Sequence, residues 1–88
     1  MSAPAKNPAR FVETRIEDET VVMLLATGDF FSLRDSAAAI WHLIDGSRDE
    51  AQIAAELAAV YDAAPADLAP DVAAFVDELR GAGLLAGE

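Results

Sequence analysis

The chain has 88 residues, which is enough for one small domain around a single hydrophobic core. Sixteen carboxylates against six basic side chains give it a formal net charge of −10 at pH 7. Such a charge repels the phosphates of nucleic acids and of anionic membranes, so we expect neither as a partner; it either keeps the protein soluble or attracts a basic peptide. The absence of cysteine excludes disulfides, thiolate metal sites and cysteine nucleophiles, and it fits a cytoplasmic location, which we expect.

The N-terminal segment contains one lysine and no long apolar stretch, so it has the features of neither a signal peptide nor a membrane anchor. We expect a flexible tail over residues 1–9 and a single domain over residues 10–86. Along the domain, the spacing of apolar residues changes once, from a period typical of strands to one typical of helices.

The first part of the domain has the composition of β-strands. We predict strands over residues 11–16, 20–25 and 29–33. Residues 17–19 are polar and suit the first turn, and Gly28 can adopt a positive φ in the second. The middle strand is apolar at consecutive positions, so we expect helices to cover one of its faces and loops or a partner to shield the other.

The second part of the domain has helical periodicity. We predict a first helix over residues 36–44, with Asp35 or Ser36 as its N-cap and Gly46 as the residue that stops it. A short polar connection then leads to the second helix.

Two further helices complete the pattern. Ser47 and Glu50 have the spacing of a capping box at the start of the second helix. After the helix breaker Pro65, we predict the third helix over about residues 68–80, with Pro70 in its first turn. Three strands followed by three helices with short connections indicate an α+β domain of the winged-helix type.

Five segments of the chain, in this order and spacing, carry a resemblance to a known family. They read TGDFFSL at residues 27–33, AIWHLIDG at 39–46, YD at 61–62, DVAAFV at 71–76 and GLL at 83–85. Over about residues 11–85 the chain resembles the PqqD-like family, whose members are recognition elements for precursors of ribosomally synthesised and post-translationally modified peptides.

The resemblance implies a winged helix-turn-helix fold, in which a three-stranded antiparallel β-meander precedes three helices. It also implies a non-catalytic binding module, without cofactor or metal, that captures the leader segment of a precursor peptide by β-strand addition. Such a module presents the leader to a maturation enzyme, which is a protease, a cyclase or a radical enzyme. We expect a monomer.

In that family the leader pairs with the third strand and lies in the groove beside the third helix. If the leader binds in the same place here, the resemblance implies that the peptide-binding residues are Gly28, Asp29, Phe30, Phe31, Ser32, Leu33, Asp71, Val72, Phe75, Val76 and Leu79.

The chain departs from the family members that serve PQQ synthesis. Those members carry a Tyr-Pro-Glu-Gly-type stretch before the third strand, whereas residues 25–29 read LATGD here. They also carry Cys-Asp-Gly where this chain has Ile-Asp-Gly at residues 44–46. We therefore expect another peptide pathway, and lasso-peptide maturation is one candidate.

Some side chains leave alternatives open. Phe30 and Phe31 cannot both face inward on a regular strand, so the outward one is either covered by the N-terminal tail or available to a partner. We expect Trp41 in the core, and His42, the single histidine, exposed and without a metal. The carboxylates of the third helix are either solvated or in contact with basic leader residues; they are Asp71, Asp77 and Glu78.

Other functional classes fit the sequence less well. A DNA-binding winged helix needs a basic recognition helix, whereas the second helix has only Arg48 near its cap and the third only Arg80 at its end. No catalytic constellation is recognisable. The alternative that stays open is an acidic protein–protein adaptor or a self-associating winged-helix domain without a leader ligand.

Overall fold

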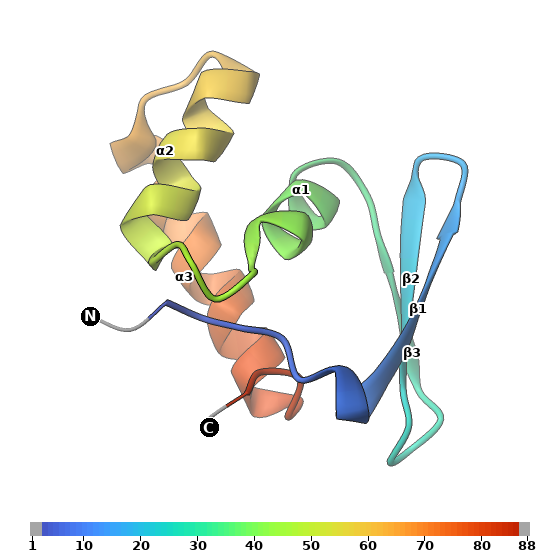
Figure 1. The fold of residues 1–88 in the computed structure, drawn as a ribbon. Helices are drawn as coiled ribbons and strands as arrows, with labels where there is room; N and C mark the ends of the chain where they lie inside the picture. The colour runs from blue at the N-terminus through green and yellow to red at the C-terminus, as the bar shows by residue number, and fades with distance from the viewer. Residues whose placement is uncertain (1–2, 87–88) are drawn as a thin grey trace.

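The computed structural model describes residues 3–86, which form a three-stranded sheet followed by three helices (Figure 1). This order confirms the predicted α+β fold with a β-meander before three helices. No described helix combines the length and the hydropathy needed to cross a membrane. After a short 3₁₀-helix (Pro8–Arg10), the elements are β1 (Phe11–Ile16), β2 (Glu19–Leu24), β3 (Phe30–Leu33), α1 (Asp35–Leu43), α2 (Glu50–Tyr61) and α3 (Pro65–Gly81).

The sheet is a meander in which β2 lies between β1 and β3 and pairs antiparallel with both. The turns need residues with positive φ, and these are Glu17 at 57° after β1 and Gly28 at 78° after β2. Among the described strands, β3 has β2 as its single neighbour, so its outer edge carries backbone N–H and C=O groups that no described strand pairs.

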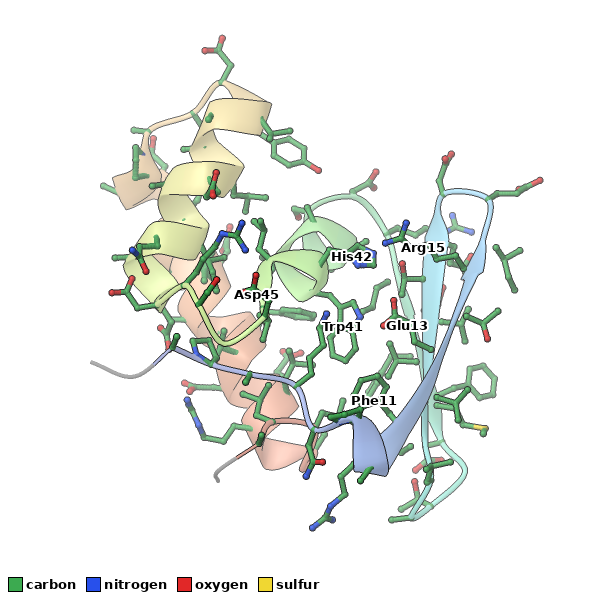
Figure 2. The ribbon with its side chains drawn as sticks, viewed as in Figure 1. Phe11, Glu13, Arg15, Trp41, His42 and Asp45 are labelled. Carbon is green, nitrogen blue, oxygen red and sulfur yellow. The ribbon has the colours of Figure 1, made fainter. Side chains whose placement is uncertain are left out.

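The core lies between the sheet and the helices, which pack on one face of it (Figure 1). Trp41 of α1 is completely buried there, as predicted, and the ring of Phe11 meets it edge-on with centroids 5.1 Å apart (Figure 2). Burial of each large apolar side chain stabilises the fold by about 1.5–3 kcal/mol. The other large side chains with almost no exposed surface are Val22, Ile44, Ile53, Leu57, Val72, Val76 and Leu84.

The opposite face of the sheet is not covered by any residue that the structure describes. Ile16 is 56% exposed and Met23 is 38% exposed on this outer face. All three helices lie on the same side of the sheet, and the described loops do not cover the other side. Cover of this second face by a partner stays a prediction.

The segment expected as a flexible tail differs from that expectation over residues 4–7. Lys6 forms a β-bridge with Leu85, and the Asn7 N–H donates to the Leu84 carbonyl at 2.8 Å. Pro4 is buried, and its carbonyl accepts from an N–H near the end of α1 at 3.0 Å. These contacts bind the segment to the helical side of the domain, whereas residues 1–2 lie outside the described part of the chain.

The Lys6 ammonium also lies 4.6 Å from the centre of the Trp41 ring. Burial of this lysine lowers its pKa below the ordinary value, and the nearby carboxylates of Glu13 and Asp45 counteract part of that effect. A cation over an indole face is favourable, and the aliphatic stem covers apolar surface at the same time.

The caps of the first two helices differ from the predictions. Arg34 is the N-cap of α1 and makes no side-chain cap bond, whereas the expected cap Asp35 is the first helical residue. The capping box of α2 consists of Asp49 and Gln52, each of whose backbone N–H groups donates to the other's side chain at 2.8 Å. Ser47 instead donates to Asp45 at 2.6 Å.

The third helix begins earlier than predicted. Pro65 is its first residue, where the missing N–H costs nothing because the first turn has no acceptor for it. Pro70 therefore lies inside the helix rather than in its first turn, and it removes one backbone hydrogen bond.

Candidate binding groove

The backbone of β3 offers donors and acceptors along its open edge. The Leu24 N–H donates to the Asp29 carbonyl at 2.7 Å, so these two residues form a hydrogen-bonded pair in the turn, next to Met23 and Phe30, the last pair of the β2–β3 ladder. Such pairs alternate with non-bonded pairs along antiparallel strands, which makes Phe31 the next residue bonded to β2. The residues between, Phe30 and Ser32, direct their N–H and C=O groups to the open edge.

A groove of about 550 Å³ lies beside this edge and separates β3 from α3. Its lining is mostly apolar. The floor is formed by Leu33 and Leu79, which are almost fully buried, and the walls by the more exposed rings of Phe31 and Phe75. The complete lining consists of Phe30, Phe31, Ser32, Leu33, Phe75, Glu78 and Leu79.

The two neighbouring phenylalanines have different positions, as expected for a strand. Phe31 shares the helix-facing side of the sheet with Leu33 and is 38% exposed, whereas Phe30 lies at the rim and is 70% exposed. Phe30 also borders a shallow hollow on the outer face, together with Val12 and Met23. None of the described N-terminal residues covers it, which leaves it available to a partner.

The structure brings most of the predicted strand and helix residues together, but it separates others from the groove. Val72 and Val76 have no exposed surface and belong to the core beneath α3, so they do not line the groove. Gly28 and Asp29 lie in the turn before β3, and Asp71 is exposed; these three do not line the groove.

The sequence leaves Glu78 as either a solvated carboxylate or a contact of basic leader residues, and the structure places it in the groove wall. The signal for it was its spacing, three residues beyond Phe75 and thus on the same side of the helix. Consecutive residues of a helix are about 100° apart around its axis, so Val76 faces the core while Phe75 faces the groove.

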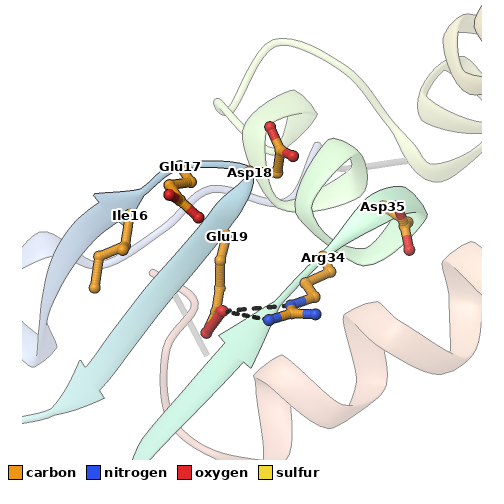
Figure 3. Close-up of a pocket in the computed structure, with 6 residues that line it drawn as sticks. All are labelled: Ile16, Glu17, Asp18, Glu19, Arg34 and Asp35. Atoms are coloured by element: carbon orange, nitrogen blue, oxygen red, sulfur yellow. Dashed lines mark hydrogen bonds and ion pairs between the residues drawn. The ribbon is translucent and has the colours of Figure 1, made fainter.

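A polar cluster at the end of β3 holds the side chain of Ser32. Its hydroxyl donates to Glu19. Arg34 donates to the same carboxylate at 2.9 Å, as Figure 3 shows. The hydrogen bond from Ser32, and then that from Arg34, hold the pKa of Glu19 below its usual value. These contacts engage the Ser32 side chain while the backbone of this residue stays directed at the open edge.

The same cluster borders an acidic hollow of about 300 Å³ between the β1–β2 turn and the start of α1 (Figure 3). It is lined by Ile16, Glu17, Asp18, Glu19, Arg34 and Asp35. Among the described residues, no group of three or more histidine, cysteine or acidic side chains is arranged to hold a metal ion.

A second polar cluster connects α1 to the face of the sheet that it packs on (Figure 2). The Trp41 indole N–H donates to Glu13 at 3.0 Å, and Arg15 donates to Nδ1 of His42 at 3.1 Å. The other ring nitrogen of His42 then carries the proton and donates to the Thr20 hydroxyl at 3.1 Å. The expectation of an exposed histidine is therefore wrong: the ring is half-buried and lies between charged neighbours.

The electrostatic surroundings of His42 disfavour its charged form. Burial lowers the pKa of the ring below its ordinary value, and the positive charge of Arg15 lowers it further, against the opposing effect of Glu13. A protonated ring would also direct a donor at the Arg15 guanidinium, which is a donor itself.

Comparisons with known proteins agree with this architecture. The family model described as coenzyme PQQ synthesis protein D (PqqD) matches residues 19–85. A structure of TbiB1 in complex with the TbiA(β) leader peptide is 26% identical, with a TM-score of 0.82 and coverage of 96% of both chains. A structure of lasso peptide synthetase B1 complexed with the leader peptide is 23% identical, with a TM-score of 0.80 over 94% of this chain and 96% of that one. No curated protein matches the chain.

The matched region contains both elements that border the groove, β3 and α3, and it spans well over half of the chain. The chain belongs to the PqqD family.

Proposed function

We propose that this protein is a non-catalytic module that captures the leader segment of a ribosomally made precursor peptide. The leader adds as a strand to the open edge of β3 and buries alternate side chains in the groove against α3. The module then presents the bound leader to a maturation enzyme. The observation that carries this proposal is an unpaired strand edge next to an apolar groove.

The comparisons support the same proposal. TbiB1, which shares 26% of its residues with this chain, was solved with a leader peptide, and so was lasso peptide synthetase B1. Peptide maturation of the lasso type is therefore the pathway that we favour. The leader contacts are assigned to the groove residues Phe30, Phe31, Ser32, Leu33, Phe75 and Leu79.

Strand pairing at β3 together with burial of side chains in the groove is sufficient for micromolar binding of a leader. Ordering a flexible leader costs about 2–5 kcal/mol, and a micromolar complex requires about 8 kcal/mol net. Main-chain hydrogen bonds to Phe30 and Ser32 fix the register of the added strand. Each apolar leader side chain buried between β3 and α3 contributes about 1.5–3 kcal/mol, so a few such anchors suffice.

The protein is proposed to act as a monomer whose β3 edge is reserved for the leader. The rival is the self-associating domain, in which the same edge pairs with a second copy. A sedimentation-velocity measurement over a range of concentrations separates the two, because self-association makes the mass depend on concentration.

Fluorescence anisotropy tests the binding function directly. The probe is a labelled synthetic peptide with the N-terminal half of the short reading frame beside the gene, and the C-terminal half of the same frame is the control. We expect saturable binding of the N-terminal half at micromolar concentration and no binding of the control. Absence of binding to a folded sample would contradict the proposal.

A further inference from the structure

The groove between β3 and α3 has one ionisable side chain in its lining, Glu78. Apart from Ser32, whose hydroxyl is bonded to Glu19, all other described residues that line it are aromatic or aliphatic. A carboxylate in a mostly apolar wall loses part of its hydration when a ligand covers it, so it needs a partner in the complex.

The other carboxylates in this part of α3 are placed differently. Asp77 is paired with Arg80 at 2.8 Å and does not line the groove. Asp71 is exposed, as Glu78 is, but it does not line the groove. Within residues 3–86, Glu78 has no ion-pair partner, so its carboxylate is available at the groove.

The position of Glu78 in the helix does not favour a structural role. It lies in the last turn of α3, where the negative end of the helix dipole repels a carboxylate. The residues four positions before and after it are Ala74 and Ala82, so neither offers a cation for a helical ion pair. A cation supplied from outside would relieve this repulsion.

An added strand brings such a cation to the right place. Every second side chain of the added strand faces α3. A basic side chain two residues after an apolar anchor therefore lies in the same groove, further along the strand. The net charge of −10 attracts a cationic peptide at long range and thus raises its association rate.

We propose that Glu78 is a specificity-determining residue that pairs with a lysine or arginine side chain of the leader. This inference rests on the proposed leader-binding function and narrows its ligand to a peptide with an apolar anchor and a basic residue on one face of the strand.

Selection from a phage-displayed library of random peptides tests the inference. Glu78→Gln removes the charge, Glu78→Lys reverses it, and Asp67→Asn is the matched control, since Asp67 is an exposed carboxylate of the same helix outside the groove. We expect peptides selected by the wild type to carry lysine or arginine at a fixed spacing from an apolar residue. Those selected by Glu78→Lys should carry aspartate or glutamate at that position.

Affinities of the selected peptides complete the test. The basic peptide should bind Glu78→Gln about three- to tenfold more weakly than the wild type, and it should bind Asp67→Asn as tightly as the wild type. Selected peptides without a charge preference, or equal affinity for Glu78→Gln, would overturn the role of Glu78 and leave strand addition intact. Failure of the wild type to select any peptide would overturn the binding function itself.

Discussion

The side chain and the backbone of Ser32 have different roles. Its hydroxyl is engaged by Glu19, whereas its N–H is directed at the open edge of β3, where the leader would pair. A change at this one residue can therefore remove the backbone donor without breaking the ladder between β2 and β3.

We expect Ser32→Pro to weaken leader binding by at least about tenfold, because it removes a main-chain donor worth about 0.5–1.5 kcal/mol and disturbs the register of the added strand. The helical circular dichroism should be unchanged, since proline is tolerated on the outward side of an edge strand. The control Ser32→Ala keeps the N–H and should bind like the wild type. Unchanged affinity of Ser32→Pro would mean that the peptide binds elsewhere.

His42 makes stability depend on pH. Its folded-state pKa lies below the ordinary value of 6.5, so the unfolded chain binds the proton more readily. Stability should be fully present above about pH 6.5 and should fall as the pH decreases from there to the lowered pKa of the folded state. The groups that face the ring are Arg15 and Lys6, which disfavour its charge, and Glu13, which favours it.

Urea unfolding between pH 7.5 and pH 5.5 checks this expectation. The wild type should lose stability over this range, and His42→Gln, which keeps a polar group towards Thr20, should show a much flatter profile. Equal slopes for the two proteins would show that other groups cause the pH dependence.

At the scale of the element, one side of α3 packs in the core and another side lines the groove. Phe75 and Val76 are neighbours in the chain, yet Phe75 is half-buried in the groove wall and Val76 has no exposed surface. Adjacent residues of one helix thus separate binding from stability.

We expect Phe75→Ala to weaken leader binding by about tenfold or more with a small loss of stability, because it removes a groove wall. Val76→Ala should instead lower the free energy of unfolding by about 1–3 kcal/mol, since it leaves a cavity in the core, and the folded protein should keep its affinity. Chemical denaturation and peptide titration of both variants measure the two effects. Equal binding losses in the two variants would contradict the division of α3.

The sequence predicted the elements well and their exact ends less well. Asp49 and Ser47 are both good N-cap residues with a suitable partner three positions on, so the pattern alone did not decide between the two capping boxes. Pro65 is the first residue of α3, and a proline in a sequence is typical both of a helix breaker and of the first residue of a helix.

The sequence predicted that β3 and α3 border the site, but not which side chains of α3 face it. The apolar residues of α3 form one broad stripe, and hydrophobicity does not show which of them face the groove and which the core. Only packing against the other helices buries Val72 and Val76 and leaves Phe75 at the surface. The consecutive apolar residues of β2 likewise suggested two covered faces, whereas the described chain covers one.

At the scale of the whole molecule, the N-terminal segment closes the domain. Residues 4–7 bond to the segment after α3 and to the end of α1, and Lys6 covers the Trp41 ring. Such long-range pairing is invisible to local periodicity, which is why these residues were expected to be a tail.

Deletion of residues 1–7 should lower the free energy of unfolding by about 1–3 kcal/mol, because it exposes the Trp41 ring and removes backbone bonds to the C-terminal segment. Thermal unfolding followed by circular dichroism measures the loss, and tryptophan fluorescence should report a more exposed indole in the folded state. An unchanged unfolding temperature would show that the segment contributes nothing to stability.

The central claim is that a leader peptide adds to the open edge of β3 and lies against α3. The most direct test is a two-dimensional amide NMR titration of the isotope-labelled protein with the leader peptide encoded beside its gene. We expect saturable shifts concentrated in β3 and around Phe75, Glu78 and Leu79, with little change along the open edge of β1. Shifts centred on β1 or α2, or no shifts in a folded sample, would contradict it.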